Sequence, residues 1–423
     1  MHRWARRGSG CRVARLGGVA VVTVATVVAV GSPAIARAVV AVPIRPPQPG
    51  YTVVADGLAN ARGLAITTVP GHKYTSEVLY VTEAGLGAGT ATTGVRLGTG
   101  STGRVLAVQD PDTIHPQTTV VSSGLWSQST PGPDGVDTLG PAGITVATDG
   151  TLSVVMAEHY VPGLGPQPQQ GHLLHFTAQG QITSVVDVAT ASLQWANTPS
   201  RHTLGPSLPD SNPAAVTTLG FDTIVVDSAA ATVSVVSLDG TVVVLASLPD
   251  TPHGRALPTC VTTGPDGALY VGTLASTEGA GGATVYRIDP HTTAAPSQAA
   301  TVWAGGVSTI SGCAFSPDGR FFYASELTAR ETVTHPPTPG NPAGAQPSAV
   351  VRIPFDHPTT RDYLGLGVLQ LAGGIAIDVH GSIYVTNSSN HDTGAPLGQV
   401  LRFDPTARTD VCCATPRHVA YQP

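Results

Sequence analysis

Six side chains that could do chemistry follow strand-like stretches of the sequence, each where an apolar run ends. They are Glu83, Glu158, His159, Asp227, Glu326 and Asn387. Three more polar residues, Arg62, Asp210 and Asn212, stand near the start of such stretches. Carboxylate and amide oxygens are the ligands that calcium takes in proteins, and a carboxylate or imidazole beside a metal could serve as a general base. The same groups could orient a small polar ligand without any reaction.

These residue types predict a ligand-binding set and, within the same region, a metal-binding set. The ligand-binding set is Arg62, Glu83, Glu158, His159, Asp227, Glu326 and Asn387. The metal-binding set is Asn212, Asp227 and Glu158, and a divalent cation such as calcium is the candidate cofactor. A structural alternative is open for each acid, because an acid at a strand end commonly accepts hydrogen bonds from neighbouring backbone N–H groups. No catalytic residue is assigned.

A repeated phrase indicates the elements that would position these side chains. PTCVTTGPDGALYVG (Pro258 to Gly272) predicts a strand, an Asp-Gly turn and a second strand, and TVYRI (Thr284 to Ile288) predicts a third. Related phrases begin at five other places, namely ARGLA (Ala61), PAGITV (Pro141), NPAAV (Asn212), SGCAF (Ser311) and GGIAI (Gly373). A further strand is predicted before each copy, at Thr52 to Leu58, Thr119 to Leu125, Ile182 to Val188, Thr241 to Ser247, Ala300 to Gly306 and Gly367 to Gly373.

Four strands repeated six times are typical of an all-β, six-bladed β-propeller with four-stranded antiparallel blades. A β-sandwich of similar length would lack this constant phrase. The strand at Thr52 precedes any inner strand, whereas the last unit stops after its third strand at Phe403. We therefore expect the N-terminal strand to complete the last blade and close the ring, which leaves no unpaired edge. In a propeller the ends of the second strands meet the starts of the inner strands at one mouth of the channel, so the candidate residues should gather there.

The chain divides into four predicted parts. Residues 1–36 predict an export signal, since five arginines precede an apolar run and Ala34-Ile35-Ala36 provides a small-residue cleavage site. A twin-arginine signal at Arg6-Arg7 and an uncleaved anchor are the alternatives. Residues 37–50 predict a proline-rich linker, 51–404 the propeller and 405–423 a C-terminal tail. We expect a secreted or cell-envelope protein, monomeric and without a stable membrane span once the signal is cleaved.

The charge balance excludes some partners. The chain has a formal net charge of −6, and loss of the five arginines of the signal would change it to −11. Lys73 is the one lysine of the sequence, so no basic cluster exists to bind nucleic acid. A small molecule or a cell-envelope partner fits this composition better.

Four cysteines follow the signal, which is an even number in an oxidising compartment. Cys260 and Cys313 occupy equivalent places in neighbouring repeats, so they could form a bridge between adjacent inner strands or could be two small buried hydrophobic residues. Cys412 and Cys413 lie in the predicted tail, and the connectivity of the four stays open.

The phrases NARGLA…LYVTEAG, DSNPAAV…VVDS, PTCVTTGPDGALYVG and GGIAIDVHGSIYVTN resemble the ScyD/ScyE family of exported bacterial proteins. That family is similar to six-bladed propellers of the NHL-repeat and TolB-like type and is named from genes associated with synthesis of the pigment scytonemin. The resemblance covers about Tyr51 to Asp404. It implies a propeller and export, and it transfers no catalytic residue.

Another six-bladed group, the gluconolactonase and senescence-marker lactonases, holds a divalent metal through Glu, Asn and Asp at inner-strand starts. Here the corresponding places are read as Arg62, Ala142, Asn212, Thr259, Gly312 and Gly373, of which only Asn212 fits.

Three functions remain open after this comparison. We favour a binding module that recognises a small ligand or partner at the channel mouth. The alternative is a metal-dependent hydrolase or lyase, lactonase-like, acting on a small metabolite through Glu158, His159, Asp227 and Asn212. A structural cell-envelope scaffold is the third, so whether the protein is an enzyme is left undecided.

Overall fold

A computed structural model describes residues 50–70, 75–90, 92–132, 135–158, 168–198, 210–251, 255–274, 281–328, 348–388 and 398–404. All of them belong to one compact unit, Gln48–Pro423. The predicted signal, the C-terminal tail, His159 and the cysteines outside the inner strands lie outside the described residues.

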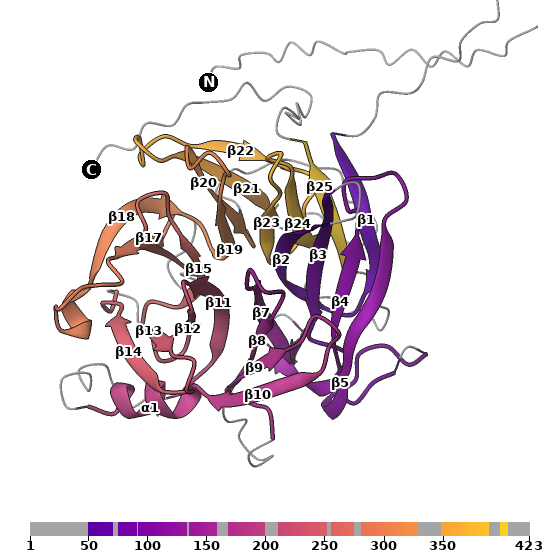
Figure 1. The fold of residues 1–423 in the computed structure, drawn as a ribbon, viewed down its shortest axis with the longest axis horizontal. Helices are drawn as coiled ribbons and strands as arrows, with labels where there is room; N and C mark the ends of the chain where they lie inside the picture. Colours follow the sequence, from indigo (N-terminus) through magenta and orange to yellow (C-terminus); the bar gives the residue numbers. More distant parts are fainter. Residues whose placement is uncertain are drawn as a thin grey trace, which may run out of the picture. The chain divides into compact units, whose positions relative to one another are not determined.

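The described strands form six antiparallel sheets around a common centre, which confirms the predicted six-bladed, all-β propeller (Figure 1). Blade one contains β2 (Ala61–Pro70), β3 (Thr75–Glu83), β4 (Gly98–Gln109), β5 (Gln117–Gly132) and β6 (Gly135–Leu139). Blade two contains β7 (Pro141–Val146), β8 (Leu152–Met156), β9 (His172–Phe176) and β10 (Ile182–Asp187). Blade three contains β11 (Pro213–Leu219), β12 (Asp222–Asp227), β13 (Thr232–Val236) and β14 (Val242–Ser247).

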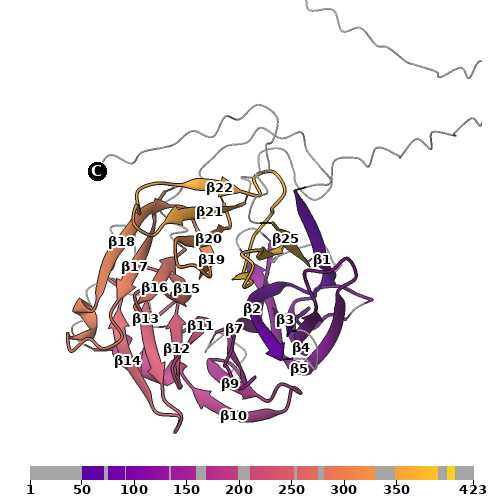
Figure 2. The same cartoon turned by 45° about the horizontal axis from the view of Figure 1, so that its top comes forward.

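The remaining blades follow the same order from the centre outwards, as β15 to β18 show in Figure 2. Blade four contains β15 (Pro258–Thr263), β16 (Leu269–Thr273), β17 (Ala283–Ile288) and β18 (Ala300–Val307). Blade five contains β19 (Ile310–Phe315), β20 (Phe321–Glu326), β21 (Ala349–Pro354) and β22 (Asp362–Leu364). Blade six contains β23 (Ile375–Ile377), β24 (Ile383–Asn387), β25 (Gly398–Phe403) and β1 (Tyr51–Leu58). Of two short helices, α1 (Ala189–Ala196) lies in the connection between blades two and three, and η1 (Pro296–Gln298) lies between β17 and β18 of blade four.

The ring closes as predicted, through the first described strand. β1 pairs antiparallel with β25, with Tyr51 opposite Phe403 and Thr52 opposite Arg402. Consecutive inner strands contact one another from β2 through β7, β11, β15, β19 and β23 and back to β2. The N-terminal strand therefore supplies the outer edge of blade six and leaves the inner strands as a continuous circle.

The hydrophobic core is divided among the junctions between blades. Each of the six junctions holds its own cluster of buried apolar residues, and Phe176, Tyr270 and Tyr384 are among the largest fully buried side chains. Middle strands such as β8 are buried on both faces, whereas the outer strand β10 is largely exposed. A single blade cannot cover its own apolar faces, so each blade depends on its two neighbours.

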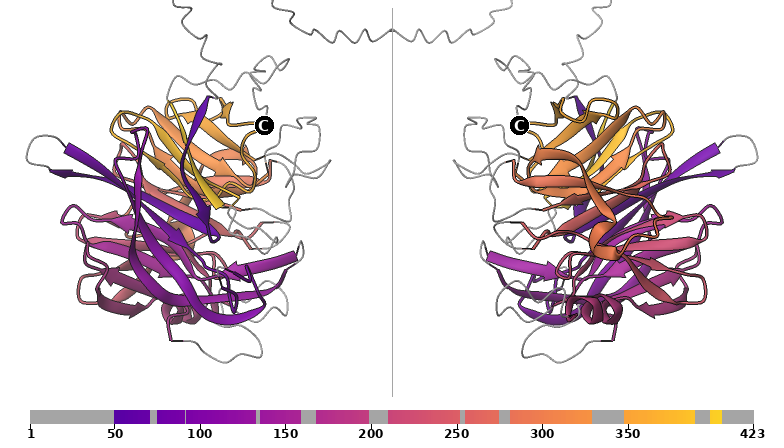
Figure 3. Two further views of the ribbon diagram at one scale, coloured as in Figure 1. Left: turned by 90° about the vertical axis from the view of Figure 1, so that its right-hand side faces the viewer. Right: turned by 90° about the vertical axis from the view of Figure 1, so that its left-hand side faces the viewer.

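Two strand predictions need correction. Blade one has a fifth strand, β6, in a segment between Leu125 and Pro141 for which the sequence analysis predicts no strand, because β5 runs on past its blade and pairs back with β6. The outer strand of blade five is β22 and not Gly367–Gly373. Gly365 and Gly367 have φ angles of +69° and +80°, and the N–H groups of Val368 and Leu369 donate to the carbonyl oxygen of Gly365, so the chain turns there. In the side views of Figure 3, the β2–β3 and β5–β6 hairpins project from opposite faces of the ring.

Among the residues that the structure describes, no helix has both the length and the apolarity that a membrane span requires.

Candidate functional site

The central channel contains a cavity of about 450 Å³ lined by residues from all six inner strands. Most of the lining residues are small or apolar, and the polar ones include Thr138, Asn212, Thr259 and Ser311. Arg62 is the one charged residue among the described lining residues. A volume of this size lies within the usual range for small-molecule sites.

The first channel-facing position of each inner strand defines what we call the first ring. Strand pairing fixes this position, because Ala61, Pro213 and Ile310 lie opposite Glu83, Asp227 and Glu326 in their blades. The first ring consists of the residues that follow these and their equivalents, namely Arg62, Ala142, Ala214, Thr259, Ser311 and Gly373. The sequence repeats place Asn212 and Gly312 here instead, which is two residues before Ala214 and one residue after Ser311.

Close approach of neighbouring inner strands requires glycine just after the first ring. A Cβ atom on Gly63 would lie 2.6 Å from the carbonyl oxygen of Ala142, and one on Gly143 would lie 2.6 Å from the Cα atom of Ala215. Thr259 and Ser311 also join the strands, since their hydroxyl groups donate to the carbonyl oxygens of Ile310 and Ala372 in the next blade. Neighbouring inner strands are therefore packed closely and hydrogen-bonded to one another at the first ring.

Arg62 projects from the start of β2 toward the channel, and its Nη2 donates to the carbonyl oxygen of Thr138 at 2.7 Å. Loss of hydration lowers the pKa of Arg62, and the negative charge of Asp137 opposes that shift in part. Both Thr138 and Asp137 belong to β6, the strand that the sequence reading missed. The turn-forming residue types of the sequence Pro131-Gly132-Pro133-Asp134-Gly135 are a signal that could have revealed this hairpin.

Four predicted ligand residues occupy one repeat position at the end of the second strand and hold the backbone. Oε1 of Glu83 accepts from the N–H of Ala59 at 2.6 Å, and Oε1 of Glu326 accepts from that of Ser308 at 2.8 Å. Oδ1 of Asn387 accepts from the N–H of Gln370 at 2.7 Å. Glu83 also forms an ion pair with Arg104, at 2.6 Å between Oε2 and Nε. None of these three residues lines the cavity.

Asp227 is the fourth member of this group and is the most fully engaged. One oxygen accepts from the N–H groups of Asn212 and Ala230, both at 2.9 Å, and the other accepts from the hydroxyl of Ser211. Burial raises the pKa of Asp227, and these donors counteract the shift. The structure thus turns this carboxylate toward protein donors rather than toward the cavity.

Glu158 lies at the edge of the cavity, beside the lining residues Ala157 and Asn212. Its N–H donates to Oδ1 of Asn212 at 3.0 Å, and its backbone has a φ of +61°. Burial raises the pKa of Glu158 to about 8, with further contributions from the charge of Asp210, from a side-chain hydrogen bond to Asp210 and from the charge of Asp227. Glu158 therefore keeps its proton near neutral pH, beside the side chain of Asp210.

The residues proposed to hold a metal do not form a suitable donor set. The described residues contain no group of three or more His, Cys, Asp and Glu side chains that could hold a metal ion. Of the set Asn212, Asp227 and Glu158, Asp227 commits both oxygens to protein donors. Binding calcium there would require breaking those hydrogen bonds.

A disulfide joins Cys260 of β15 to Cys313 of β19, with their Cα atoms 5.7 Å apart. Of the two alternatives that the sequence leaves open for this pair, the structure has the bridge between neighbouring inner strands. Both cysteines belong to the lining of the cavity, so the bridge fastens blades four and five at the channel wall.

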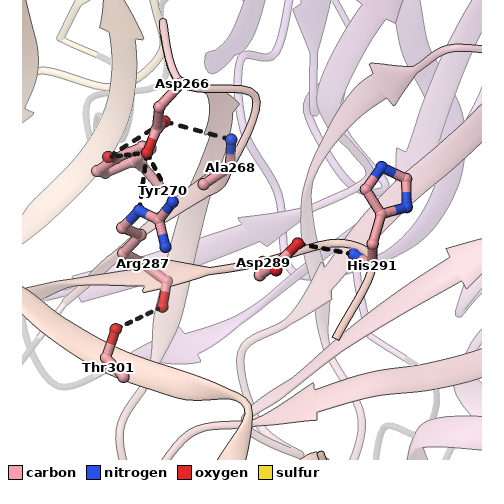
Figure 4. Close-up of polar contacts among 7 residues, drawn as sticks. All are labelled: Asp266, Ala268, Tyr270, Arg287, Asp289, His291 and Thr301. Carbon is pink, nitrogen blue, oxygen red and sulfur yellow. Dashed lines mark hydrogen bonds and ion pairs between the residues drawn. The ribbon is translucent and has the colours of Figure 1, made fainter. Parts of the chain in front are cut away.

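A second polar cluster, Asp266, Tyr270 and Arg287, lies outside the cavity lining (Figure 4). Arg287 forms an ion pair with Asp266 at 2.7 Å, and the Tyr270 hydroxyl lies 3.2 Å from the same carboxylate. Burial raises the pKa of Tyr270 to about 12, and its ring packs edge-on against Trp303 and Phe315. These contacts fix the Asp-Gly turn of blade four to its second and third strands.

A sequence profile described as SMP-30/Gluconolactonase/LRE-like region matches residues 167–421, which is more than half of the 423-residue chain. No curated protein sequence matches the chain significantly. The matching segment spans Asp210, Asn212 and Asp227 but begins after Arg62 and Glu158.

Several solved structures are similar to the chain at low sequence identity. Regucalcin from Agrobacterium tumefaciens, described as a calcium-binding protein, is 16% identical with a TM-score of 0.38, over 58% of this chain and 67% of that one. Virginiamycin B lyase from Staphylococcus aureus is 11% identical with a TM-score of 0.40, over 83% and 98%. A chain of a nidogen–laminin complex is 14% identical with a TM-score of 0.42, over 68% and 84%. At these values the similarities assign no ligand.

Proposed function

The chain belongs to the SMP-30/gluconolactonase/LRE-like family, and from this membership we propose that it is an exported propeller that binds a small molecule in its central channel. The cavity of about 450 Å³ carries the proposal, because all six inner strands line it and a few polar groups converge on it. Ligand sites of propellers and barrels commonly combine small apolar walls with a few polar groups that fix orientation.

Channel-filling substitutions test this proposal. Ala214→Phe places a ring in the cavity, and Ala142→Leu is a milder second variant. Val243→Phe adds a comparable side chain on the outer strand of blade three, where Val243 is 58% exposed, and so serves as the control. Saturation-transfer NMR with a metabolite mixture should detect binding to the wild type and Val243→Phe, with loss in the two channel variants. Equal binding to all four folded proteins would show that the channel is not the site.

The same proposal includes the protein's family subgroup, its location and its oligomeric state. The phrases around Pro258 to Gly272 support placement within the ScyD/ScyE group of exported proteins. Export by the segment 1–36, a secreted or cell-envelope location and a monomeric state are parts of the proposal. Cleavage after Ala36 would be seen as the N-terminal sequence of the natively exported protein.

Hydrolysis or elimination of a small metabolite such as a lactone is the second candidate function, and the Glu158–Asp210 pair favours it. One carboxyl group of the pair could accept a proton from an attacking water while the other donates a proton to the leaving oxygen. The family name includes gluconolactonase, and regucalcin is described as calcium-binding. The alternative uses no metal here, since Asp227 is committed to protein donors.

The hydrolysis of glucono-δ-lactone at different pH values distinguishes the two functions. If Glu158 is the base, Glu158→Gln should lower kcat by about 10²-fold or more. Asp210→Asn should move the limb of the pH profile near pH 8 downward, because the charge of Asp210 contributes to the raised pKa of Glu158. A rate that neither substitution changes would leave ligand binding as the function.

A further inference from the structure

Arg62 is the exception in the first ring. The other five positions carry Ala142, Ala214, Thr259, Ser311 and Gly373, none of which is ionisable. The hydroxyl protons of Thr259 and Ser311 are donated to carbonyl oxygens of the next blade. One guanidinium group therefore faces a cavity whose other first-ring side chains are small and neutral.

The guanidinium of Arg62 is only partly used by the protein. A guanidinium has five N–H donors in a planar fork, and the described structure pairs one of its nitrogens, Nη2, with the carbonyl oxygen of Thr138. Among the described residues, no carboxylate lies within ion-pair distance of Arg62. The negative charge of Asp137 raises the pKa of Arg62 and so opposes part of the effect of burial.

The acids that could have neutralised this cation are turned elsewhere. Glu83 is paired with Arg104, Asp227 accepts from three protein donors, and Glu326 accepts from Ser308. A cation that has lost much of its hydration and has no carboxylate in ion-pair contact is costly, and an arriving anion offsets that cost. The channel is therefore electrostatically suited to a negative group, although the chain as a whole is acidic.

We propose that the ligand of the channel carries a carboxylate, which binds the guanidinium of Arg62 at the first ring. This inference rests on the proposed binding function and names the class of ligand. Guanidinium and carboxylate form paired, charge-assisted hydrogen bonds. The small side chains opposite Arg62 leave the remaining cavity for an apolar or weakly polar body.

Benzoate and benzamide test the proposal, because they have the same shape and differ in charge. Isothermal titration of the full chain should give a dissociation constant for benzoate about tenfold or more below that for benzamide. Arg62→Gln should abolish the difference, and Arg62→Lys should restore part of it. Arg320→Gln is the matched control, since Arg320 is exposed in a hairpin turn away from the channel.

Each other outcome is decisive. A benzoate preference that survives in Arg62→Gln would overturn the assignment of the anion to Arg62. Equal binding of the two probes to the wild type would overturn the carboxylate class and leave channel binding intact. If neither probe binds while the metabolite screen detects channel ligands, the carboxylate inference fails alone. If no ligand of any kind is lost in Ala214→Phe, the binding function itself fails.

Discussion

The carboxylate of Glu326 accepts a hydrogen bond from the N–H of Ser308 at 2.8 Å, while its second oxygen has no hydrogen-bond partner among the described residues. The equivalent Glu83 has an arginine partner, and the equivalent Asn387 is a neutral amide. Glu326 is thus a buried acid without an arginine in ion-pair contact, and it differs from Asp227, whose two oxygens both accept hydrogen bonds. Burial raises its pKa to about 8.

This burial predicts that stability falls as pH rises from about 4.5 to about 8. In the unfolded chain the carboxyl ionises near 4.5, whereas the folded protein keeps the proton up to about pH 8. Between these values the unfolded state binds fewer protons, so the free energy of unfolding decreases with pH. Glu326→Gln should be more stable than the wild type by about 1–2 kcal/mol at pH 8 and about equal at pH 4. Urea unfolding at the two pH values measures this, and equal pH dependence of the two proteins would contradict it.

Reduction of the Cys260–Cys313 bridge should destabilise the ring. The bridge spans 53 residues of sequence and joins blades four and five, and a disulfide of this kind stabilises by about 2–4 kcal/mol. We expect a reductant to lower the Tm of the wild type. The double variant Cys260→Ser with Cys313→Ser should begin at the lower Tm and show no further response. A wild type that melts identically with and without reductant would argue against a stabilising bridge.

Asp227 should matter for stability and not for ligand affinity. Asp227→Ala leaves the N–H groups of Asn212 and Ala230 and the Ser211 hydroxyl without their acceptor, at a cost of about 3 kcal/mol or more. Asp227→Asn retains an oxygen for the two N–H groups and should lose less. Chemical unfolding measures both effects. If the Asp227→Asn protein were as stable as the wild type but bound the ligand more weakly, Asp227 would belong to the ligand-binding site.

Gly63→Ala should destabilise the contact between blades one and two. The new Cβ would lie 2.6 Å from the carbonyl oxygen of Ala142, so the inner strands would have to separate, at a cost of about 1–3 kcal/mol. Gly305→Ala on β18 is the control, because a Cβ there meets nothing within 4 Å. In thermal unfolding, the Tm of Gly63→Ala should be lower than that of Gly305→Ala. Equal Tm values would mean that the strands can move apart without loss.

The architecture could be predicted because its signals are local. The Asp-Gly turns, the alternating apolar residues and the position of Thr52 before the first inner strand together predicted six blades and the pairing of β1 with β25. The strand β6 was missed because it pairs with an extension of β5 that the repeat does not contain. The segment after Gly365 was misread since its apolar residues follow a turn instead of a strand.

The candidate site was harder to predict, because sequence fixes where a side chain is attached but not which way it turns. Glu83, Asp227 and Glu326 do lie at equivalent strand ends, yet their oxygens accept from backbone N–H groups. The importance of Arg62 within the first ring depends on five small neighbours from other blades. That comparison needs the strand register, which the repeated phrases alone placed two residues away at Asn212 and one residue away at Gly312.

Closure by β1 also has a consequence for the order of assembly. The first strand of the propeller to be synthesised, β1, has no strand partner until β25, about 340 residues later, has followed it. Until then β1 has no place in blade six, and the circle of inner strands is not closed between β23 and β2. The pairing of β1 with β25 can therefore complete the ring only after the whole propeller sequence has been synthesised.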